Sequence, residues 1–190
     1  KIRVIYGHFP FGIHKLVDGY PIQYITMLRD PVQRVISTYY HYKRASGDGG
    51  AETMSAKIDI SEFVFNGETL ETDNAMVRLI SGVAPFPFGQ CDHEIYKVAI
   101  DNINKYFAEV LILEKMDRSV ARLRKLLGID NVILSNDNVN TQQDRRIISD
   151  DTIKQIHELN KYDVMLYKYV LRRFSIKSVI SKALLQAIRN

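Results

Sequence analysis

The sequence predicts an α/β protein built on a parallel sheet. Short apolar segments rich in β-branched residues alternate with segments of helical periodicity, and glycine or proline separates most of them. Strands that alternate with helices along a chain usually pair into one parallel sheet flanked by helices. With 190 residues and no internal repeat, the chain is predicted to form one domain over residues 1–190.

Two strands and a long helix are predicted first. The segments "IRVIY" (2–6) and "IQYITML" (22–28) are short, apolar and bounded by glycine or proline, so both are expected to be buried strands. Pro31 suits the first position of a helix and Asp30 suits its N-cap, so a helix is predicted from Pro31 to about Ala45. Its apolar residues are expected to pack on the sheet: Val32, Val35, Ile36 and Tyr39.

The remaining elements continue the alternation. Helices are predicted at 59–67, 72–82, 93–107 and 116–128, strands at 109–113 and 131–134, and polar loops at 46–58 and 135–146. The last element is a long helix that begins at Ser149. Asp150 and Asp151 lie in its first turn, where the helix dipole favours negative charge.

The composition narrows the classes of function. With 46% hydrophobic and 25% charged residues, the chain resembles ordinary globular proteins. Its net charge of +4 favours an anionic ligand only weakly, and no zinc-finger or basic-zipper pattern is present, so we expect no nucleic-acid partner. Cys91 is the only cysteine, which excludes an intrachain disulfide and a cysteine-rich metal site. No apolar run reaches the roughly 18 residues of a membrane span, and no metal site is predicted.

A charged residue, Arg29, stands where the second predicted strand ends and the helix begins. Ligands of open parallel sheets bind beyond the carboxyl ends of the strands. The N-terminus of the following helix offers backbone N–H groups to an anion, and an arginine can bind phosphate with two parallel hydrogen bonds. Ser37 lies with Arg34 and His41 on the polar face of this helix, near enough to bind the same phosphate. The alternative is structural, with Asp30 as a cap and Arg29 in a salt bridge.

The segment "RDPVQRVISTYYHY" (29–42) closely resembles the 3′-phosphate-binding segment of sulfotransferases that use 3′-phosphoadenosine 5′-phosphosulfate (PAPS). The resemblance is strongest to the branch of heparan sulfate 2-O-sulfotransferase and its bacterial relatives. It covers most of residues 4–174 and includes "DNAMVRLISG" (73–82) and the segment 103–128. It implies the sulfotransferase fold, a P-loop-NTPase-like parallel sheet flanked by helices.

The resemblance also implies a set of cofactor-binding residues. In that family, the arginine of Arg-Asp-Pro and the serine on the following helix hold the 3′-phosphate of PAPS, and these match Arg29 and Ser37. Arg145 and Arg146 lie in the polar loop where the family often places further cofactor contacts, although a solvated charge pair explains them equally well.

His8 is the candidate catalytic base. It directly follows the first predicted strand, so it is expected at a carboxyl end of the sheet near Arg29. A histidine with the ordinary pKa of about 6.5 accepts a proton near neutral pH, although an isolated histidine at a turn is more often structural. The resemblance implies catalysis, because a His-Gly-His stretch carries the base of the 2-O-sulfotransferase branch and His8 matches its second histidine. His14 is expected to be structural or to lie on the acceptor side.

The reaction implied by the resemblance is in-line transfer of the sulfuryl group from PAPS to a hydroxyl of a carbohydrate acceptor, which leaves 3′-phosphoadenosine 5′-phosphate (PAP). A family hallmark, the phosphosulfate loop with Pro-Lys-Thr, does not occur in the 190 residues. Because the chain begins inside a predicted strand, we expect the fold's first strand and this loop to precede Lys1. The alternative is a catalytically inactive nucleotide-binding or interaction domain of the same fold.

The sequence leaves two compartments open. A single cysteine fits a bacterial cytoplasm, whereas the eukaryotic members of the resembled family reside in the Golgi lumen.

Overall fold

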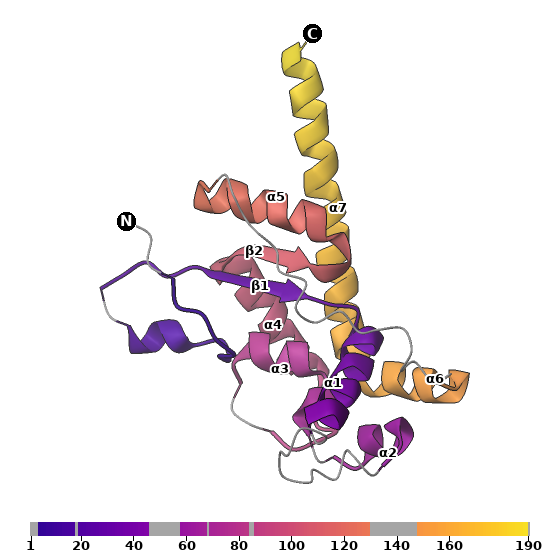
Figure 1. Ribbon diagram of the computed structural model, residues 1–190. Coiled ribbons are helices and arrows are strands. Elements are labelled where there is room, and N and C mark those ends of the chain that lie inside the picture. Colours follow the sequence, from indigo (N-terminus) through magenta and orange to yellow (C-terminus); the bar gives the residue numbers. More distant parts are fainter. Residues whose placement is uncertain are drawn as a thin grey trace.

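A two-stranded parallel sheet lies at the centre of the computed structural model, with helices around it (Figure 1). The structure describes residues 4–17, 19–45, 58–67, 69–83, 86–129 and 148–189, without the side chains of 44, 45 and 176–189. Strand β1 (Tyr24–Leu28) pairs with β2 (Phe107–Ile112) from Tyr24 beside Phe107 to Leu28 beside Ile112. The parallel α/β class is therefore confirmed in this coarse form, and the P-loop-NTPase-like sheet stays a prediction.

The helices and turns follow the chain in an order close to the predicted one. The α-helices are α1 (Pro31–Ala45), α2 (Ile60–Phe65), α3 (Ala75–Ser81), α4 (His93–Tyr106), α5 (Met116–Leu127), α6 (Asp150–Leu159) and α7 (Lys161–Arg189). Short 3₁₀ turns are η1 (Ile13–Leu16), η3 (Leu70–Thr72) and η4 (Leu113–Lys115). The predicted strand at 131–134 and the loop at 135–146 lie outside the described residues.

Two apolar clusters hold these elements together. The larger cluster joins the sheet to α3, α4 and α7; in Figure 1, α3 and α4 lie below β1 and β2, and α7 runs along their right side. Its buried members are Leu28, Met76, Val77, Ile80, Cys91, Ala99, Ile103, Val110, Ile112, Leu166, Val170 and Phe174. The smaller cluster joins α1 to α2 and α6 through Val35, Tyr39, Phe63, Val64 and Ile156.

The smaller cluster corrects the predicted partner of the first long helix. Val35 and Tyr39 are buried, as their spacing predicts, but they contact α2 and α6 rather than the sheet. Periodicity identifies the apolar face of a helix, and it does not identify which neighbour covers that face.

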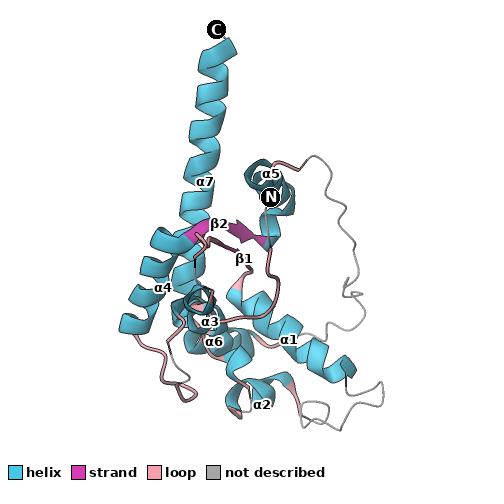
Figure 2. Ribbon diagram, turned by 90° about the vertical axis from the view of Figure 1, so that its left-hand side faces the viewer, coloured by secondary structure: helices cyan, strands magenta, loops and turns pink. Residues whose placement is uncertain are grey.

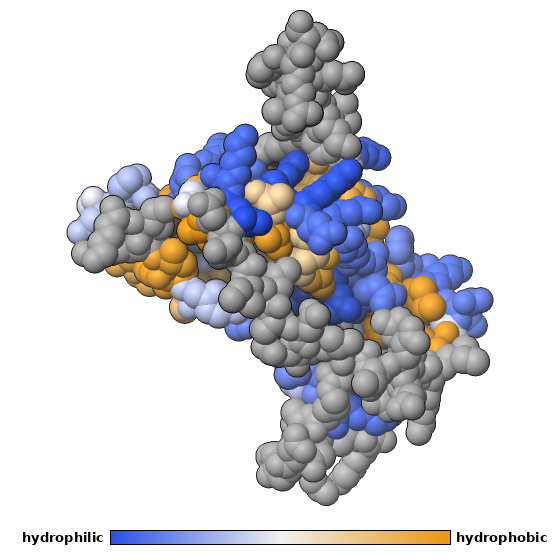
Figure 3. Space-filling model, turned by 45° about the horizontal axis from the view of Figure 1, so that its top comes forward, coloured by the Kyte–Doolittle hydropathy of each residue, from blue (hydrophilic) through white to orange (hydrophobic). Residues whose placement is uncertain are grey.

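The predicted strand at 2–6 is also wrong over its described part. Residues 4–6 form no strand, and the exposed fractions of Val4, Ile5 and Tyr6 are 73%, 63% and 90%. Among the described residues the sheet contains only β1 and β2, and this apolar segment pairs with neither of them. Apolar surface gathers near this N-terminal segment, at the left of Figure 3.

The predicted long helix from Ser149 is two helices. Ser149 caps α6 through a hydrogen bond from the Thr152 N–H, as expected, but α6 ends at Leu159 and α7 begins at Lys161. Asn160 lies at the break with a non-helical backbone (φ −102°, ψ 30°). Its side-chain nitrogen donates to the carbonyls of Thr72 and Ile156, and its side-chain oxygen accepts from the Asn74 N–H. The first part of α7 packs in the larger cluster, and its C-terminal part extends away from the other elements (Figure 2).

Candidate functional site

The junction between β1 and α1 forms at the carboxyl end of the sheet, where the sequence predicts it. The Asp30 carboxylate accepts a hydrogen bond from the Gln33 N–H at 3.0 Å, and the Asp30 carbonyl accepts the first helical bond from Arg34 at 2.8 Å. Asp30 is thus the N-cap of α1, and Pro31 is its first residue, because proline supplies the helical φ and has no N–H to satisfy. Arg29 is half-buried between the strand end and this cap.

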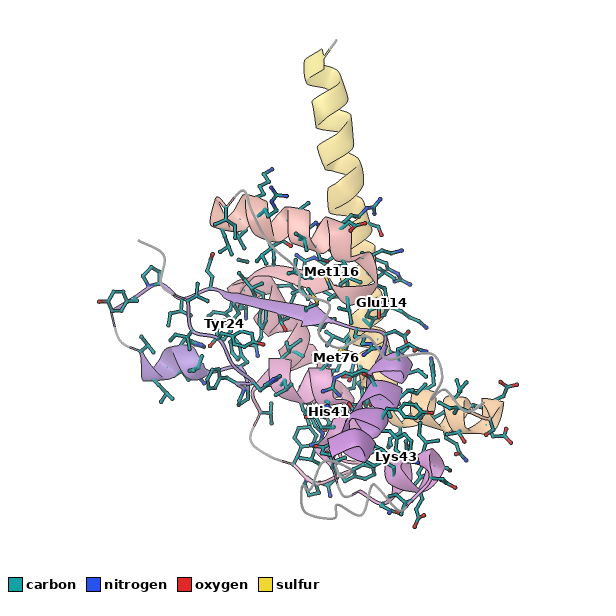
Figure 4. The ribbon with its side chains drawn as sticks, in the orientation of Figure 1. Tyr24, His41, Lys43, Met76, Glu114 and Met116 are labelled. Carbon is teal, nitrogen blue, oxygen red and sulfur yellow. The ribbon has the colours of Figure 1, made fainter. Side chains whose placement is uncertain are left out.

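The end of β2 lies beside this junction. Because Leu28 pairs with Ile112 in parallel register, the chain positions two residues beyond each strand also meet. There, the Glu114 carboxylate accepts a hydrogen bond from the Asp30 N–H at 2.8 Å with one oxygen and from the Tyr167 hydroxyl at 2.9 Å with the other. Figure 4 shows Glu114 at the end of the sheet where β1 passes into α1. Sequence patterns missed this contact because it joins residues 84 positions apart.

The polar face of α1 carries two residues with different surroundings, Arg34 and Ser37. Arg34 is committed to the 3₁₀ turn η3, since it forms an ion pair with the Glu71 carboxylate and donates to the Glu71 carbonyl at 2.9 Å. Ser37, one turn further, is half-buried, and its hydroxyl makes no hydrogen bond to another described residue. An open hydroxyl two turns from the Asp30 cap fits the role of a ligand for an anion held at the junction.

The structure does not bring His8 together with Arg29. His8 is exposed, and the segment that carries it is fastened at the other end of β1, where the Gly12 and His14 N–H groups donate to the Tyr24 hydroxyl at 3.3 and 3.0 Å. Figure 1 shows this indigo segment at the tail of the β1 arrow, whereas α1 begins beyond its head. Five strand residues rise about 16 Å. The expected approach of His8 to Arg29 rested on a strand at 2–6, and residues 4–6 of that segment form no strand.

His14 has a structural role in this arrangement. Its Nδ1 lies 2.7 Å from the Tyr24 hydroxyl. Because this hydroxyl already accepts hydrogen bonds from two backbone N–H groups, it donates a hydrogen bond to the His14 imidazole. The His14 ring stacks on Tyr106 at 5.2 Å and lies 5.1 Å from Phe11. Figure 4 shows Tyr24 at the opposite end of β1 from Glu114.

A second helix N-terminus is closed by buried polar side chains that lie far apart in the sequence. The Asp163 carboxylate of α7 accepts hydrogen bonds from the N–H groups of Met76 and Val77, at 3.0 and 2.8 Å, in the first turn of α3. In return, the Asn74 side-chain oxygen accepts from the N–H groups of Tyr162 and Asp163, at 2.9 and 3.1 Å. The two helices therefore cap each other. Asn74 holds a left-handed backbone (φ 48°) to do so, which is uncommon outside glycine.

The environment of these caps shifts the ionisation of two buried groups. Burial raises the pKa of Asp163 to about 6, against the opposing effect of the two N–H groups that it accepts. Burial, and then the charges of Asp73 and Asp163, raise the pKa of Cys91 to about 12, so this thiol stays protonated. Arg78 neutralises Asp73 by an ion pair and also donates to the Phe86 carbonyl at 2.7 Å, which holds the 86–91 connection against α3.

Other candidate features are placed as follows. Arg145 and Arg146 lie outside the described residues. A cavity of about 40 Å³ between β2, α4, α5 and α7 has room for about one water molecule, and so it does not hold a nucleotide. Within the described ranges, no three His, Cys, Asp or Glu side chains are placed to share a metal ion. No described helix combines the length and the apolar character that membrane crossing requires.

Comparison with known proteins gives two matches. A sequence model of the galactose-3-O-sulfotransferase family matches residues 1–183. The chain is also similar to galactose-3-O-sulfotransferase 2 of Homo sapiens, with 24% identity over 184 residues that cover 90% of this chain and 45% of the human protein. The chain thus spans less than half the length of this curated relative. These matches support the carbohydrate sulfotransferase resemblance, but not specifically the heparan sulfate 2-O-sulfotransferase branch.

Proposed function

Because this chain belongs to the galactose-3-O-sulfotransferase family, we propose that it acts in sulfuryl transfer to a hydroxyl of a galactose-containing carbohydrate. The observation that carries the proposal is the Arg29–Asp30–Pro31 junction at the carboxyl end of β1, where parallel α/β sheets bind their ligands. The similarity to a human protein favours the eukaryotic of the two compartments considered above. We therefore propose the Golgi lumen rather than a bacterial cytoplasm.

We propose PAPS as the sulfuryl donor, with its 3′-phosphate bound by Arg29 and Ser37. The residues present fit this group: a guanidinium is the side chain best suited to bidentate phosphate binding, and Ser37 offers a hydroxyl that bonds no other described residue. When bound, PAPS supplies the sulfuryl group and leaves as PAP. Arg29 and Ser37 contribute binding and orientation. Arg145 and Arg146 are proposed as further anion contacts, and the P-loop-NTPase-like sheet is proposed as the fold around them.

His8 is the proposed general base, on the strength of the Tyr6-Gly7-His8 segment. A neutral imidazole accepts the proton of the acceptor hydroxyl near neutral pH, which typically contributes about 10² to 10⁴ in rate. The expected result for His8→Ala is a fall in kcat of at least about 10² with the affinity for PAP unchanged. An unchanged kcat would remove His8 from the mechanism.

A second candidate function is nucleotide or partner binding without catalysis. The observation that favours it is the placement of the His8 segment at the tail of β1, away from Arg29. This function predicts that PAP binds in a manner that depends on Arg29. It also predicts that no sulfuryl group is transferred to any galactose-containing acceptor tested.

Calorimetric titration tests the binding proposal directly. We expect PAP to bind the parent chain and Arg29→Ala to weaken that binding by about 10². Adenosine 5′-phosphate, which lacks the 3′-phosphate, should bind both proteins alike. Arg118→Ala, which removes an exposed arginine from α5, is the matched control. No PAP binding by the parent, or equal losses for both nucleotides, would contradict the proposal.

A further inference from the structure

Glu114 lies at the candidate phosphate site, and no role in that site has been assigned to it. The Glu114 carboxylate joins three elements: it follows β2, accepts from the backbone at the start of α1, and accepts from Tyr167 of α7. The bond to the Asp30 N–H, at 2.8 Å, spans 84 residues of sequence, so it depends on the tertiary fold rather than on local geometry.

The Asp30 N–H is half of the peptide group that links Arg29 to Asp30. A hydrogen bond from this N–H fixes the plane of that peptide group, because the peptide bond is rigid. The plane in turn fixes the dihedral ψ of Arg29, and ψ sets the position of the Arg29 side chain relative to the start of α1. Glu114 is therefore placed to fix this relation between Arg29 and α1 through the backbone.

Tyr167 holds the Glu114 carboxylate in place. Its hydroxyl donates to the second carboxylate oxygen at 2.9 Å. Burial first, and then the hydrogen bond and charge of Glu114, raise the pKa of Tyr167, so the phenol remains a neutral donor throughout the physiological range. Glu114 is exposed, but both of its carboxylate oxygens are engaged on different elements, which restrains the orientation of the carboxylate.

The backbone amides at the start of α1 are largely committed within the chain. Glu114 takes the Asp30 N–H, Pro31 has none, and the Asp30 side chain takes the Gln33 N–H. In the part of the chain that the structure describes, the Val32 N–H is the only first-turn amide of α1 without a hydrogen bond. An anion at this junction therefore depends on side chains, and above all on the direction of Arg29.

We propose that Glu114 is a positioning residue for the 3′-phosphate site, which aims Arg29 by fixing the Arg29–Asp30 peptide group from the end of β2. This inference rests on the proposed function. It assigns selectivity for the 3′-phosphate to a hydrogen-bonded link between β2, α1 and α7, in addition to the two residues that bind the phosphate.

The experiment measures the affinities for PAP and for adenosine 5′-phosphate in Glu114→Ala, Glu114→Gln and Tyr167→Phe, together with amide hydrogen exchange at Asp30. Glu114→Ala should weaken PAP binding about tenfold, leave adenosine 5′-phosphate binding unchanged and speed exchange of the Asp30 N–H. Glu114→Gln should stay within about threefold of the parent, because the amide oxygen still accepts from Asp30. Glu94→Ala, an exposed glutamate on α4, is the control and should change nothing.

The outcomes separate this inference from the proposed function. If Arg29→Ala loses PAP selectively but Glu114→Ala equals the parent, the function stands and the inference is overturned. Equal losses for both nucleotides in Glu114→Ala would also overturn it, since they indicate general destabilisation. If the parent binds no PAP, the function fails and the inference fails with it. Should Glu114→Ala not fold, Tyr167→Phe decides: about threefold selective weakening supports the inference, and no selective change overturns it.

Discussion

The N-terminus of α3 is closed by the chain itself, whereas the N-terminus of α1 borders solvent beside Arg29. In α3, the fully buried Asp163 accepts the first-turn N–H groups of Met76 and Val77. In α1, the cap Asp30 is only half-buried, and Gln33 in the first turn is exposed. Both ends attract negative charge for the same reason, which is that their first N–H groups have no partner within the helix and point along the positive end of the helix dipole. The difference shows that burial separates a helix end closed by the fold from one that stays accessible, and we propose that the accessible end binds a ligand.

The largest expected effect is on the closed helix end. Asp163→Ala leaves two buried N–H groups without an acceptor, and each costs about 1–3 kcal/mol, partly offset by the removal of a buried charge. We expect the free energy of unfolding to fall by about 3 kcal/mol, measured by urea denaturation at pH 7. A loss below about 1 kcal/mol, the value for an exposed cap, would contradict the comparison.

The same carboxyl group should give the protein a distinctive pH dependence. Folding raises the pKa of Asp163 from 3.8 to about 6, so between these values the folded protein holds a proton that the unfolded chain has lost. The contribution of Asp163 to the free energy of unfolding therefore falls as the pH rises through this window, by up to about 3 kcal/mol.

Asp163→Asn removes this titration and serves as the control for it. The difference between the pH–stability profiles of the parent and Asp163→Asn should change between pH 4 and 6 and be constant above pH 7. Parallel profiles throughout would show that burial does not raise the pKa of Asp163.

The free energy of unfolding should depend less on the cap of the open helix end, at the start of α1, than on Asp163. Asp30→Ala removes one half-exposed cap, so we expect a loss of about 1 kcal/mol in the free energy of unfolding. Asp92→Ala, which removes the equivalent cap of α4, should cost about the same. Because the bond to Glu114 uses the Asp30 backbone, PAP affinity should change less than threefold, and a larger fall would assign Asp30 a direct part in binding.

The smallest effect on stability is expected for Ser37. Ser37→Ala removes a hydroxyl that bonds no other described residue, so the melting temperature should not change measurably. PAP affinity should nevertheless fall by about tenfold, through loss of one hydrogen bond to a charged group. Ser175→Ala on α7 is a suitable control, because the Ser175 hydroxyl donates a hydrogen bond to the Leu171 carbonyl of the same helix. Unchanged PAP affinity would leave Ser37 without a role.

Local patterns predicted the open helix end, and long-range contacts determined the closed one. Asp30, Pro31 and the bounds of α1 follow from capping chemistry that operates within a few residues. The mutual caps of Asn74 and Asp163 join residues 89 positions apart, and sequence periodicity carries no signal for such a pair. The Asp73-Asn74 pair at the start of a helical segment was a weak hint in the sequence.

The same distinction explains the errors at the strands. The β-propensity of residues 4–6 is real, but a strand also needs a neighbour that accepts its hydrogen bonds, and this requirement is not local. The expected place of His8 depended on that strand, so it failed with it. Glu114 was equally hidden, because only the register of β1 against β2 brings it to Asp30.

The most direct test of the central claim is a nuclear magnetic resonance titration of the ¹⁵N-labelled chain with PAP, with adenosine 5′-phosphate as the comparison. The account predicts that PAP-specific shifts of backbone amide signals concentrate between Arg29 and Ser37, while the signals of Met76 and Val77 stay in place. PAP-specific shifts at Met76 and Val77, or none between Arg29 and Ser37, would contradict the assignment of the open helix end as the anion site.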